Sequence, residues 1–202
     1  MTVLEGERSR EFAPQSRRQR LIEIVRARSL LRGTRVKLAS GAESSFYFNM
    51  KPTVFDPEGA ALVADLMLEQ VQRDEAQLVG GLEMGAVPIV ASIVQLSFLT
   101  RGDPGVQGFF VRKAAKDHGT RKLIEGVAEG AALAGKRAVI VEDVTTTGAS
   151  ALTAVAAARE AGLEIRTLVT IVDRLEGAEE NFSRHGLELV ALTTARDYGI
   201  GG

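Results

Sequence analysis

The chain has 202 residues, of which 45% are hydrophobic and 25% charged, and its formal net charge is −1. This length accommodates one domain with a sheet covered on both faces. The near-neutral charge argues against a nucleic-acid partner, and the absence of cysteine excludes disulfides, thiolate zinc sites and a cysteine nucleophile. No apolar run is long enough to span a membrane and residues 1–9 do not resemble a signal peptide, so we expect a cytoplasmic protein without membrane partners.

The N-terminal quarter predicts an arm, a helix and a hairpin. Residues 1–16 are polar and predict a loose arm. Apolar residues at helical spacing among arginines predict an amphipathic helix over 17–31, ended by Gly33. Residues 36–38 and 46–49 predict the two strands of a hairpin.

The rest of the chain alternates between strands and helices. Asp56 as N-cap and Pro57 in the first turn predict a helix that runs to Arg73. Further helices are expected over 86–96 and 150–161, and strands over 78–80, 108–112, 124–126, 138–141, 165–172 and 187–192. This alternation predicts an α/β fold with a mostly parallel sheet flanked by helices, whose ligands bind at the carboxyl ends of the strands.

The most informative stretch runs from Ala138 to Ser150. Four apolar residues end in Glu142 and Asp143, and a loop rich in threonine and glycine leads into an alanine-rich helix. By itself the acidic pair is better explained by one carboxylate capping a turn and the other facing water. Followed by hydroxyls, a glycine and a helix N-terminus, it predicts a site for a ligand that carries both a phosphate and sugar hydroxyls.

A second stretch concentrates positive charge. Arg112, Lys113, Lys116 and His118 fall within seven residues and Gly119 follows. Alone, such a segment is best explained as a solvated surface loop. Beside a phosphate site it predicts a movable clamp that neutralises negative charge on the ligand and excludes water.

The stretch from Val139 to Gly148 resembles the phosphoribosyl-pyrophosphate (PRPP) signature of the type I phosphoribosyltransferases. The resemblance implies that Glu142 and Asp143 contact the ribose hydroxyls and that the turn binds the 5′-phosphate. It implies Mg²⁺ as cofactor, held mainly through PRPP, with Glu142 and Asp143 as candidates to contact the ion through water. The implied PRPP-binding residues of this stretch are Glu142, Asp143, Val144, Thr145, Thr146, Thr147, Gly148, Ala149 and Ser150.

The basic stretch resembles the flexible catalytic loop of the orotate phosphoribosyltransferases within that family. The resemblance makes Arg112, Lys113, Lys116 and His118 both PRPP-binding and catalytic, and it places them on a loop over 112–124. In these enzymes the loop reaches across a homodimer interface. The resemblance therefore implies that this chain is a homodimer.

The base-binding side rests on Arg174, which ends a predicted strand and matches the family arginine that recognises the carboxylate of orotate. A structural ion pair with Asp173 or Glu176 is the competing explanation of Arg174. The resemblance also assigns orotate contacts to Thr146, Tyr47 and Phe48.

The aromatic residues Tyr47 and Phe48 belong to a stretch that, with Ser40-Gly41, resembles the N-terminal hood over the pyrimidine ring; plain packing on the core is the alternative. Gly80 to Pro88 resembles the loop that cradles pyrophosphate, although a tight turn alone would also explain its glycines. Two lysines of some family members are missing here, at Ala39 and Gly85, and Lys37 or Lys51 is a candidate to replace their charge.

Taken together, the resemblance implies one phosphoribosyltransferase domain over 1–202, with the helix and hood over 17–55. Its implied reaction is the displacement of pyrophosphate from PRPP by N1 of orotate, which gives orotidine 5′-phosphate in pyrimidine biosynthesis. Two rival functions share the PRPP signature. One is a purine or uracil phosphoribosyltransferase, and the other is a regulator that binds PRPP without catalysis.

Overall fold

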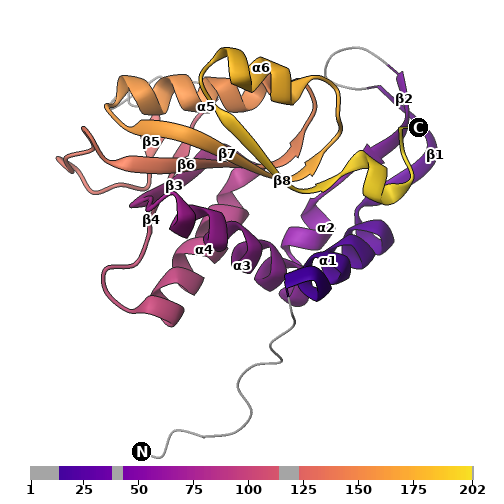
Figure 1. Ribbon diagram of the computed structural model, residues 1–202, viewed down its shortest axis with the longest axis horizontal. Coiled ribbons are helices and arrows are strands. Elements are labelled where there is room, and N and C mark those ends of the chain that lie inside the picture. The colour runs from indigo at the N-terminus through magenta and orange to yellow at the C-terminus, as the bar shows by residue number, and fades with distance from the viewer. Residues whose placement is uncertain (1–13, 38–42, 114–122, 202) are drawn as a thin grey trace, which may run out of the picture.

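The computed structural model describes residues 14–37, 43–113 and 123–201 of the chain. A six-stranded sheet lies between two layers of helices, and a small two-stranded sheet lies at one end of it (Figure 1). The strand order is β5-β4-β3-β6-β7-β8, and all neighbours are parallel except the β4–β5 pair. These strands are β3 (Leu78–Leu82), β4 (Gln107–Val111), β5 (Ile124–Glu125), β6 (Arg137–Thr145), β7 (Glu164–Asp173) and β8 (Glu188–Thr194). The expected α/β class is confirmed.

Alternating side chains of the buried strands pack into two separate hydrophobic cores, one on each face of the sheet. In β6, Val139 and Val141 pack with the first helical layer, whereas Ala138 and Ile140 pack with the second. Such alternation requires strands that are apolar on both faces, as the sequence of β6 is. The first layer contains α3 (Pro57–Arg73) and α4 (Ala86–Arg101), and the second contains α5 (Ala149–Glu160) and α6 (Ala178–Arg184).

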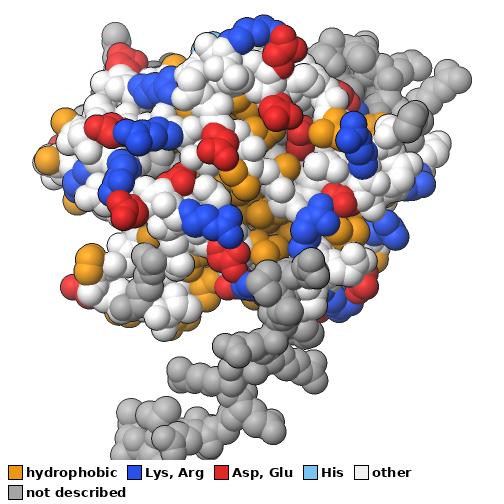
Figure 2. All heavy atoms as spheres, in the orientation of Figure 1, with side chains coloured by type: hydrophobic (Ala, Val, Ile, Leu, Met, Phe, Trp, Pro, Cys, Tyr) orange, Lys and Arg blue, Asp and Glu red, His pale blue; other side chains and the backbone are white. Residues whose placement is uncertain are grey.

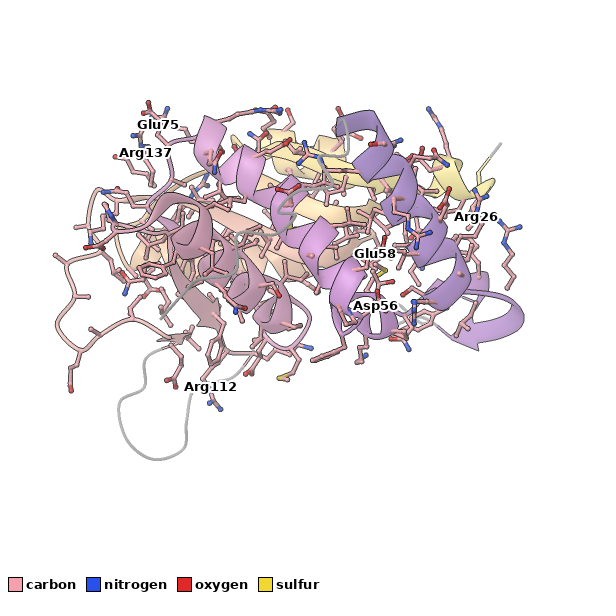
Figure 3. The ribbon with its side chains drawn as sticks, turned by 90° about the horizontal axis from the view of Figure 1, so that it is seen from below. Arg26, Asp56, Glu58, Glu75, Arg112 and Arg137 are labelled. Atoms are coloured by element: carbon pink, nitrogen blue, oxygen red, sulfur yellow. The ribbon has the colours of Figure 1, made fainter. Side chains whose placement is uncertain are left out.

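Helix α3 begins where the sequence predicts. The Asp56 side chain accepts a hydrogen bond of 2.9 Å from the backbone N–H of Gly59, as expected of an N-cap. Helix α1 (Pro14–Arg28) packs against this end of α3 through the ion pairs Arg20–Glu58 at 2.8 Å and Arg28–Asp56 at 2.9 Å. Figure 3 shows Asp56 and Glu58 on the first turns of α3 beside α1.

The predicted end of the first helix is wrong. Helix α1 ends at Arg28, and Leu30 already belongs to strand β1 (Leu30–Lys37), which pairs antiparallel with β2 (Glu43–Phe48). The buried Ser29 hydroxyl lies 2.6 Å from that of Thr53 in the short helix α2 (Lys51–Val54), which holds the chain at this junction. Gly33 does not end the helix; it lies inside β1 with a φ of +77°, next to an irregularity in the strand register.

The second correction concerns the strand that leads into the PRPP signature. The sequence predicts its end at Val141, but β6 continues to Thr145. Glu142 is paired with Thr170 and Thr145 with Asp173, so the longer neighbour β7 supplies backbone partners for the polar end of β6. Backbone pairing to β7 thus outweighs the low strand propensity of two adjacent acids.

Helices α2 and α6 and the 3₁₀ helix η1 (Ala195–Tyr198) were not predicted. Helix α3 has its expected limits, and the other predicted strands and helices start or end one to several residues from theirs. Within the described part of the chain no helix is long and apolar enough to cross a membrane. The face in Figure 2 carries basic and acidic side chains side by side around a central apolar area. Part of that area is the groove between α3 and β8 that Leu66, Val190 and Leu192 line.

Candidate functional site

The predicted site residues gather at the carboxyl ends of β6, β7 and β4. In Figure 3, Arg112, which follows the carboxyl end of β4, and Arg137, at the amino end of β6, lie on opposite sides of the molecule. The backbone N–H of Arg174, directly after β7, donates to the carbonyl of Thr145 at 2.9 Å. This bond fixes Arg174 beside the start of the threonine turn. Predicted residues Lys116 and His118, the Ser40-Gly41 pair and the missing-lysine position Ala39 lie outside the described residues.

Glu142 is the more perturbed of the two adjacent acids. Burial raises its pKa to about 7, and the neighbouring Asp143 carboxylate adds to the shift. The Thr145 hydroxyl donates to Glu142 Oε2 at 3.1 Å, which opposes the shift and fixes the carboxylate. Thr145 is itself buried, so its side chain orients Glu142; the phosphate contact expected of Thr145 stays a prediction.

Asp143 faces the turn after β3. A Cβ atom on Gly85 would lie 2.7 Å from Asp143 Oδ1, so residue 85 has no room for a side chain while this carboxylate keeps its place. Burial raises the pKa of Asp143, while the Val144 N–H, which donates to Oδ1 at 3.0 Å, and the charges of Lys51 and Lys113 oppose the rise. The charge of Lys51, one of the two candidates for replacing the missing lysines, therefore acts on Asp143. The side chain of the other candidate, Lys37, is outside the described residues.

Two residues of α6 contact the turn between β6 and α5 and fix its position. Gly148 has a φ of +80°, and a Cβ atom there would lie 2.4 Å from the ring of the buried Phe182. The Asn181 side-chain amide donates to the carbonyl of Thr147 at 2.8 Å. Both contacts come from residues more than thirty positions downstream, so the local sequence of the turn contains no signal for them.

The turn presents groups suited to an anion. Thr147, Ala149 and Ser150 are exposed and Thr146 is partly exposed, at the N-terminus of the 12-residue helix α5. The first backbone N–H groups of a helix lack partners within it, and the helix dipole favours negative charge there. The arrangement has the form of a phosphate site, with the carboxylates of Glu142 and Asp143 beside it on the same strand.

Arg174 is buried at the end of β7, with only 7% of its surface exposed. Its guanidinium carbon lies 4.5 Å from the centre of the Phe46 ring, and Nη2 lies 2.7 Å from Glu176 Oε1. The ion pair that the sequence offers as the competing explanation is therefore present. The contact with Phe46 brings the N-terminal hairpin to the same place, which is what a hood over the site requires.

The two aromatic residues expected to contact the base lie differently. Phe48 is 4% exposed, with its ring edge-on to those of Tyr198 and Phe46 at centroid distances of 5.1 and 5.9 Å, so the packing alternative holds for it. Tyr47 is partly exposed. Phe46, which was not among the residues expected to contact the base, is the ring against Arg174. It shares a face of β2 with Phe48, because alternate side chains of a strand point to the same face. The orotate contacts of Tyr47 and Phe48 stay predictions.

The basic segment leaves the sheet and returns to it at one point. The N–H of Arg112 donates to the carbonyl of Leu123 at 2.9 Å, and Arg112 Nη1 lies 3.9 Å from Glu125. The N–H of Lys113 donates to Glu83 Oε1 at 2.9 Å, and the Lys113 side chain is exposed. Glu83, which sequence reasoning did not single out, therefore connects the turn after β3 to the start of the basic segment.

Comparisons with known proteins match this arrangement. The phosphoribosyl transferase domain family matches residues 54–184. The orotate phosphoribosyltransferase of Rhodopseudomonas palustris (strain BisB5) is 54% identical over 181 residues, which make up 90% of this chain and 95% of that protein. The crystal structure of Mycobacterium tuberculosis H37Rv orotate phosphoribosyltransferase in complex with Fe(III) dicitrate has a TM-score of 0.76 at 36% identity, over 91% of this chain and 99% of that one. For the same enzyme in complex with PRPP the TM-score is 0.71 at 34% identity, again over 91% and 99%.

Proposed function

Since the chain belongs to the orotate phosphoribosyltransferases, within the phosphoribosyl transferase domain family, we propose that the site at its strand ends carries out the reaction of that family. N1 of orotate forms a bond to C1 of PRPP, and the C1–oxygen bond to pyrophosphate breaks. The products are orotidine 5′-phosphate and pyrophosphate, in pyrimidine biosynthesis. The observation that carries the proposal is the junction of Glu142 and Asp143, the Gly148 turn and Arg174 at one place.

We assign the ribose 5-phosphate part of PRPP to β6 and the turn after it. The exposed groups from Thr146 to Ser150 bind the 5′-phosphate through hydroxyls and helix N–H groups. Glu142 and Asp143 accept hydrogen bonds from the ribose hydroxyls. Charge that builds on the ribose ring as pyrophosphate departs is stabilised by these nearby carboxylates, so the reaction needs no protein nucleophile.

Mg²⁺ fits this assignment as an ion held mainly by the substrate. Among the described residues no three histidine, aspartate or glutamate side chains gather as a metal site, so these residues do not form a complete ligand set by themselves. Two adjacent carboxylates whose pKa values are raised by burial are suited to a nearby cation, directly or through water. When bound, the ion neutralises diphosphate charge, and the residues Glu142 and Asp143 would hold it from the protein side.

The base lies, in this proposal, between the hairpin and the end of β7. The guanidinium of Arg174 pairs with the carboxylate of orotate, and Thr146 and Tyr47 line the same space. Burial of Arg174 strengthens this pairing, because a partly desolvated charge pair is screened less than one in water.

The leaving pyrophosphate meets the basic side chains of Arg112, Lys113, Lys116 and His118. We add Lys51 to this group, because its charge and that of Lys113 act on the same carboxylate, Asp143. We also expect the enzyme to lie in the cytoplasm.

We expect the purified protein to consume orotate, followed by its ultraviolet absorbance, only when PRPP and Mg²⁺ are both present. Uracil and purine bases should neither react nor compete, because they lack the carboxylate that Arg174 pairs with. Turnover of uracil or a purine at a rate comparable with orotate would contradict the assignment, and binding of PRPP without any turnover would favour a regulator.

We further propose that the chain is a homodimer whose basic segment acts on the partner's site. Mixing the variants Lys116→Ala and Arg174→Ala, at an orotate concentration far below the KM of Arg174→Ala, should then restore activity that neither variant shows alone. In a heterodimer the site with an intact Arg174 receives the intact basic segment of the other subunit. Random mixing makes half of the dimers mixed and leaves one good site in each, so about a quarter of parental activity is expected.

The control for this experiment is each variant mixed with itself under the same conditions, with the oligomeric state followed by sedimentation. Activity that stays at the level of the separate variants, although mixed dimers have formed, would show that the segment serves its own subunit.

A further inference from the structure

The segment after β7 folds back so that Glu176 meets Arg174. Glu176 Oε1 lies 2.7 Å from Arg174 Nη2, and the Arg174 side chain is 4% exposed while that of Glu176 is 38% exposed. The residue between them, Leu175, has a φ of +61°, which is uncommon for a residue other than glycine, asparagine or aspartate. Its N–H donates to Asp173 Oδ1 at 2.9 Å, so a buried carboxylate holds the turn that delivers Glu176.

No local packing explains why the chain takes up this turn. Leu175 is 41% exposed, so its side chain gains little burial in return for the left-handed backbone. What the turn accomplishes is the contact of Glu176 with the guanidinium. Unusual backbone conformations cluster at functional sites. We therefore attribute this turn to a role of Glu176 in the site.

The contact also has the geometry that a substrate carboxylate would need. One face of the Arg174 guanidinium is covered by the Phe46 ring at 4.5 Å, and carboxylates bind a guanidinium in its plane, at the edge where the N–H groups point. Glu176 takes the Nη2 donor of this plane. A ligand carboxylate that uses Nη2 would compete with Glu176 for it.

The surroundings do not favour two carboxylates at this edge together. Asp173 is 4% exposed, and burial raises its pKa, with the negative charges of Glu179 and Glu176 adding to the rise. A further negative charge beside Arg174 would therefore meet repulsion from three acids unless one of them moved away. Of these acids, Glu176 is the one whose side chain can move away from Arg174. Asp173 accepts a hydrogen bond from the Leu175 N–H, whereas Glu176 is partly in solvent.

We propose that Glu176 sets the affinity of the site for orotate: it occupies the base-recognition edge of Arg174 in the free enzyme and is displaced by the carboxylate of orotate. The ligand carboxylate replaces the ion pair that it breaks, so the buried guanidinium is paired both before and after orotate binds. The resident acid lowers the affinity for orotate by the free energy of the contact that must be broken, whereas the choice between orotate and an uncharged base comes from Arg174 itself. The proposal rests on the assignment of Arg174 to orotate.

The central test is Glu176→Gln, with orotate and uracil as the probes. Removing the competing charge should lower the KM for orotate roughly two- to tenfold, in line with the worth of one partly exposed ion pair. The KM for PRPP should stay unchanged, because the turn at Gly148 is not touched. The preference for orotate over uracil should not fall, because uracil gains no more than orotate does from the loss of the ion pair. A KM for orotate that is unchanged or higher would overturn the proposal, since a higher value means that Glu176 orients the guanidinium for substrate.

Two further substitutions separate the contact from net charge. Glu180→Gln removes another carboxylate nearby in sequence, one that pairs with Arg184 at 2.7 Å, and should leave the KM for orotate unchanged. Glu176→Asp keeps the charge but shortens the side chain by one methylene, so it should resemble Glu176→Gln. If Glu176→Asp instead behaves like the parent, or Glu180→Gln lowers the KM as Glu176→Gln does, displacement from Arg174 is the wrong explanation.

Arg174→Ala distinguishes failure of this inference from failure of the function on which it rests. It should raise the KM for orotate strongly and leave that for PRPP nearly unchanged. If Arg174→Ala leaves the KM for orotate unchanged, the assignment of Arg174 itself is wrong. If they respond to Arg174→Ala but not to Glu176→Gln, the role of Arg174 stands and that of Glu176 falls. Thermal unfolding of each variant checks that it is folded.

Discussion

The Glu142→Gln variant is expected to unfold at a higher temperature than the parent protein and to turn over orotate more slowly. Burial and the charge of Asp143 raise the pKa of Glu142 to about 7 in the folded protein, from an ordinary value near 4.5. Between these two values the folded state binds more protons than the unfolded state, so the free energy of unfolding falls as pH rises. Glutamine has no charge to bury, so its folded state is not destabilised as pH rises. Its side-chain oxygen can still accept a hydrogen bond from the Thr145 hydroxyl.

The gain in stability should therefore depend on pH in a defined direction. At pH 8 the parent Glu142 is charged and the variant should melt roughly 2–5 °C higher, given the usual sensitivity of a domain of this size. Near pH 5 both the buried acid and the amide are neutral, so the difference should shrink. A difference that grows toward low pH would contradict the assigned pKa.

Activity should move the other way. A hydrogen bond from a ribose hydroxyl to a charged acceptor contributes about 1.5–3 kcal/mol, so its loss corresponds to a roughly 10- to 150-fold lower kcat/KM. Glu180→Gln is the matched control, because Glu180 is exposed and its pKa is lowered by Arg184. That variant should show neither the stabilisation nor the loss of activity. Opposite effects of Glu142→Gln on stability and turnover are the mark of a charge kept for a ligand.

The two acids and the turn after them could be predicted from the sequence because they are contiguous. A buried strand, Glu142-Asp143 and a glycine before a helix form one local pattern, and local patterns determine where a helix N-terminus and its N–H groups lie. The end of the strand was missed for a non-local reason. Residues 142–145 extend β6 because β7 offers backbone partners as far as Asp173, and nothing near Glu142 in the sequence states how long β7 is.

The other side of the site depends more on distant contacts. The sequence singles out Arg174 by its resemblance and its place after a strand, and it names Glu176 as a possible partner. The sequence does not show that Phe46 covers the guanidinium. Which aromatic residue of β2 contacts Arg174 depends on how the hairpin docks on the end of β7. The support of the turn by Asn181 and Phe182 is invisible for the same reason, since α6 was not predicted and lies more than thirty residues away.

Substituting Gly148 by alanine is expected to damage both the fold and PRPP binding. Gly148 has a φ of +80°, which costs an alanine about 1–2 kcal/mol, and the new Cβ would lie 2.4 Å from the Phe182 ring. Overpacking of a core adds about 1–3 kcal/mol, so the free energy of unfolding should fall by roughly 2–5 kcal/mol in urea titration. Relief of the clash moves the turn and its N–H groups, and the affinity for PRPP measured by calorimetry should fall roughly 10- to 100-fold.

Gly186→Ala separates the two causes. Gly186 has a φ of +66° but no atom within 4 Å of a Cβ placed on it, so its substitution costs only the backbone term of about 1–2 kcal/mol and leaves PRPP binding unchanged. Adding Phe182→Leu to Gly148→Ala makes room for the new methyl group beneath the turn. The double variant should therefore lose less stability than the sum of the single variants and should regain part of the affinity for PRPP. Strict additivity, or a Gly148→Ala protein that behaves like Gly186→Ala, would mean that the ring of Phe182 does not set the position of the phosphate turn.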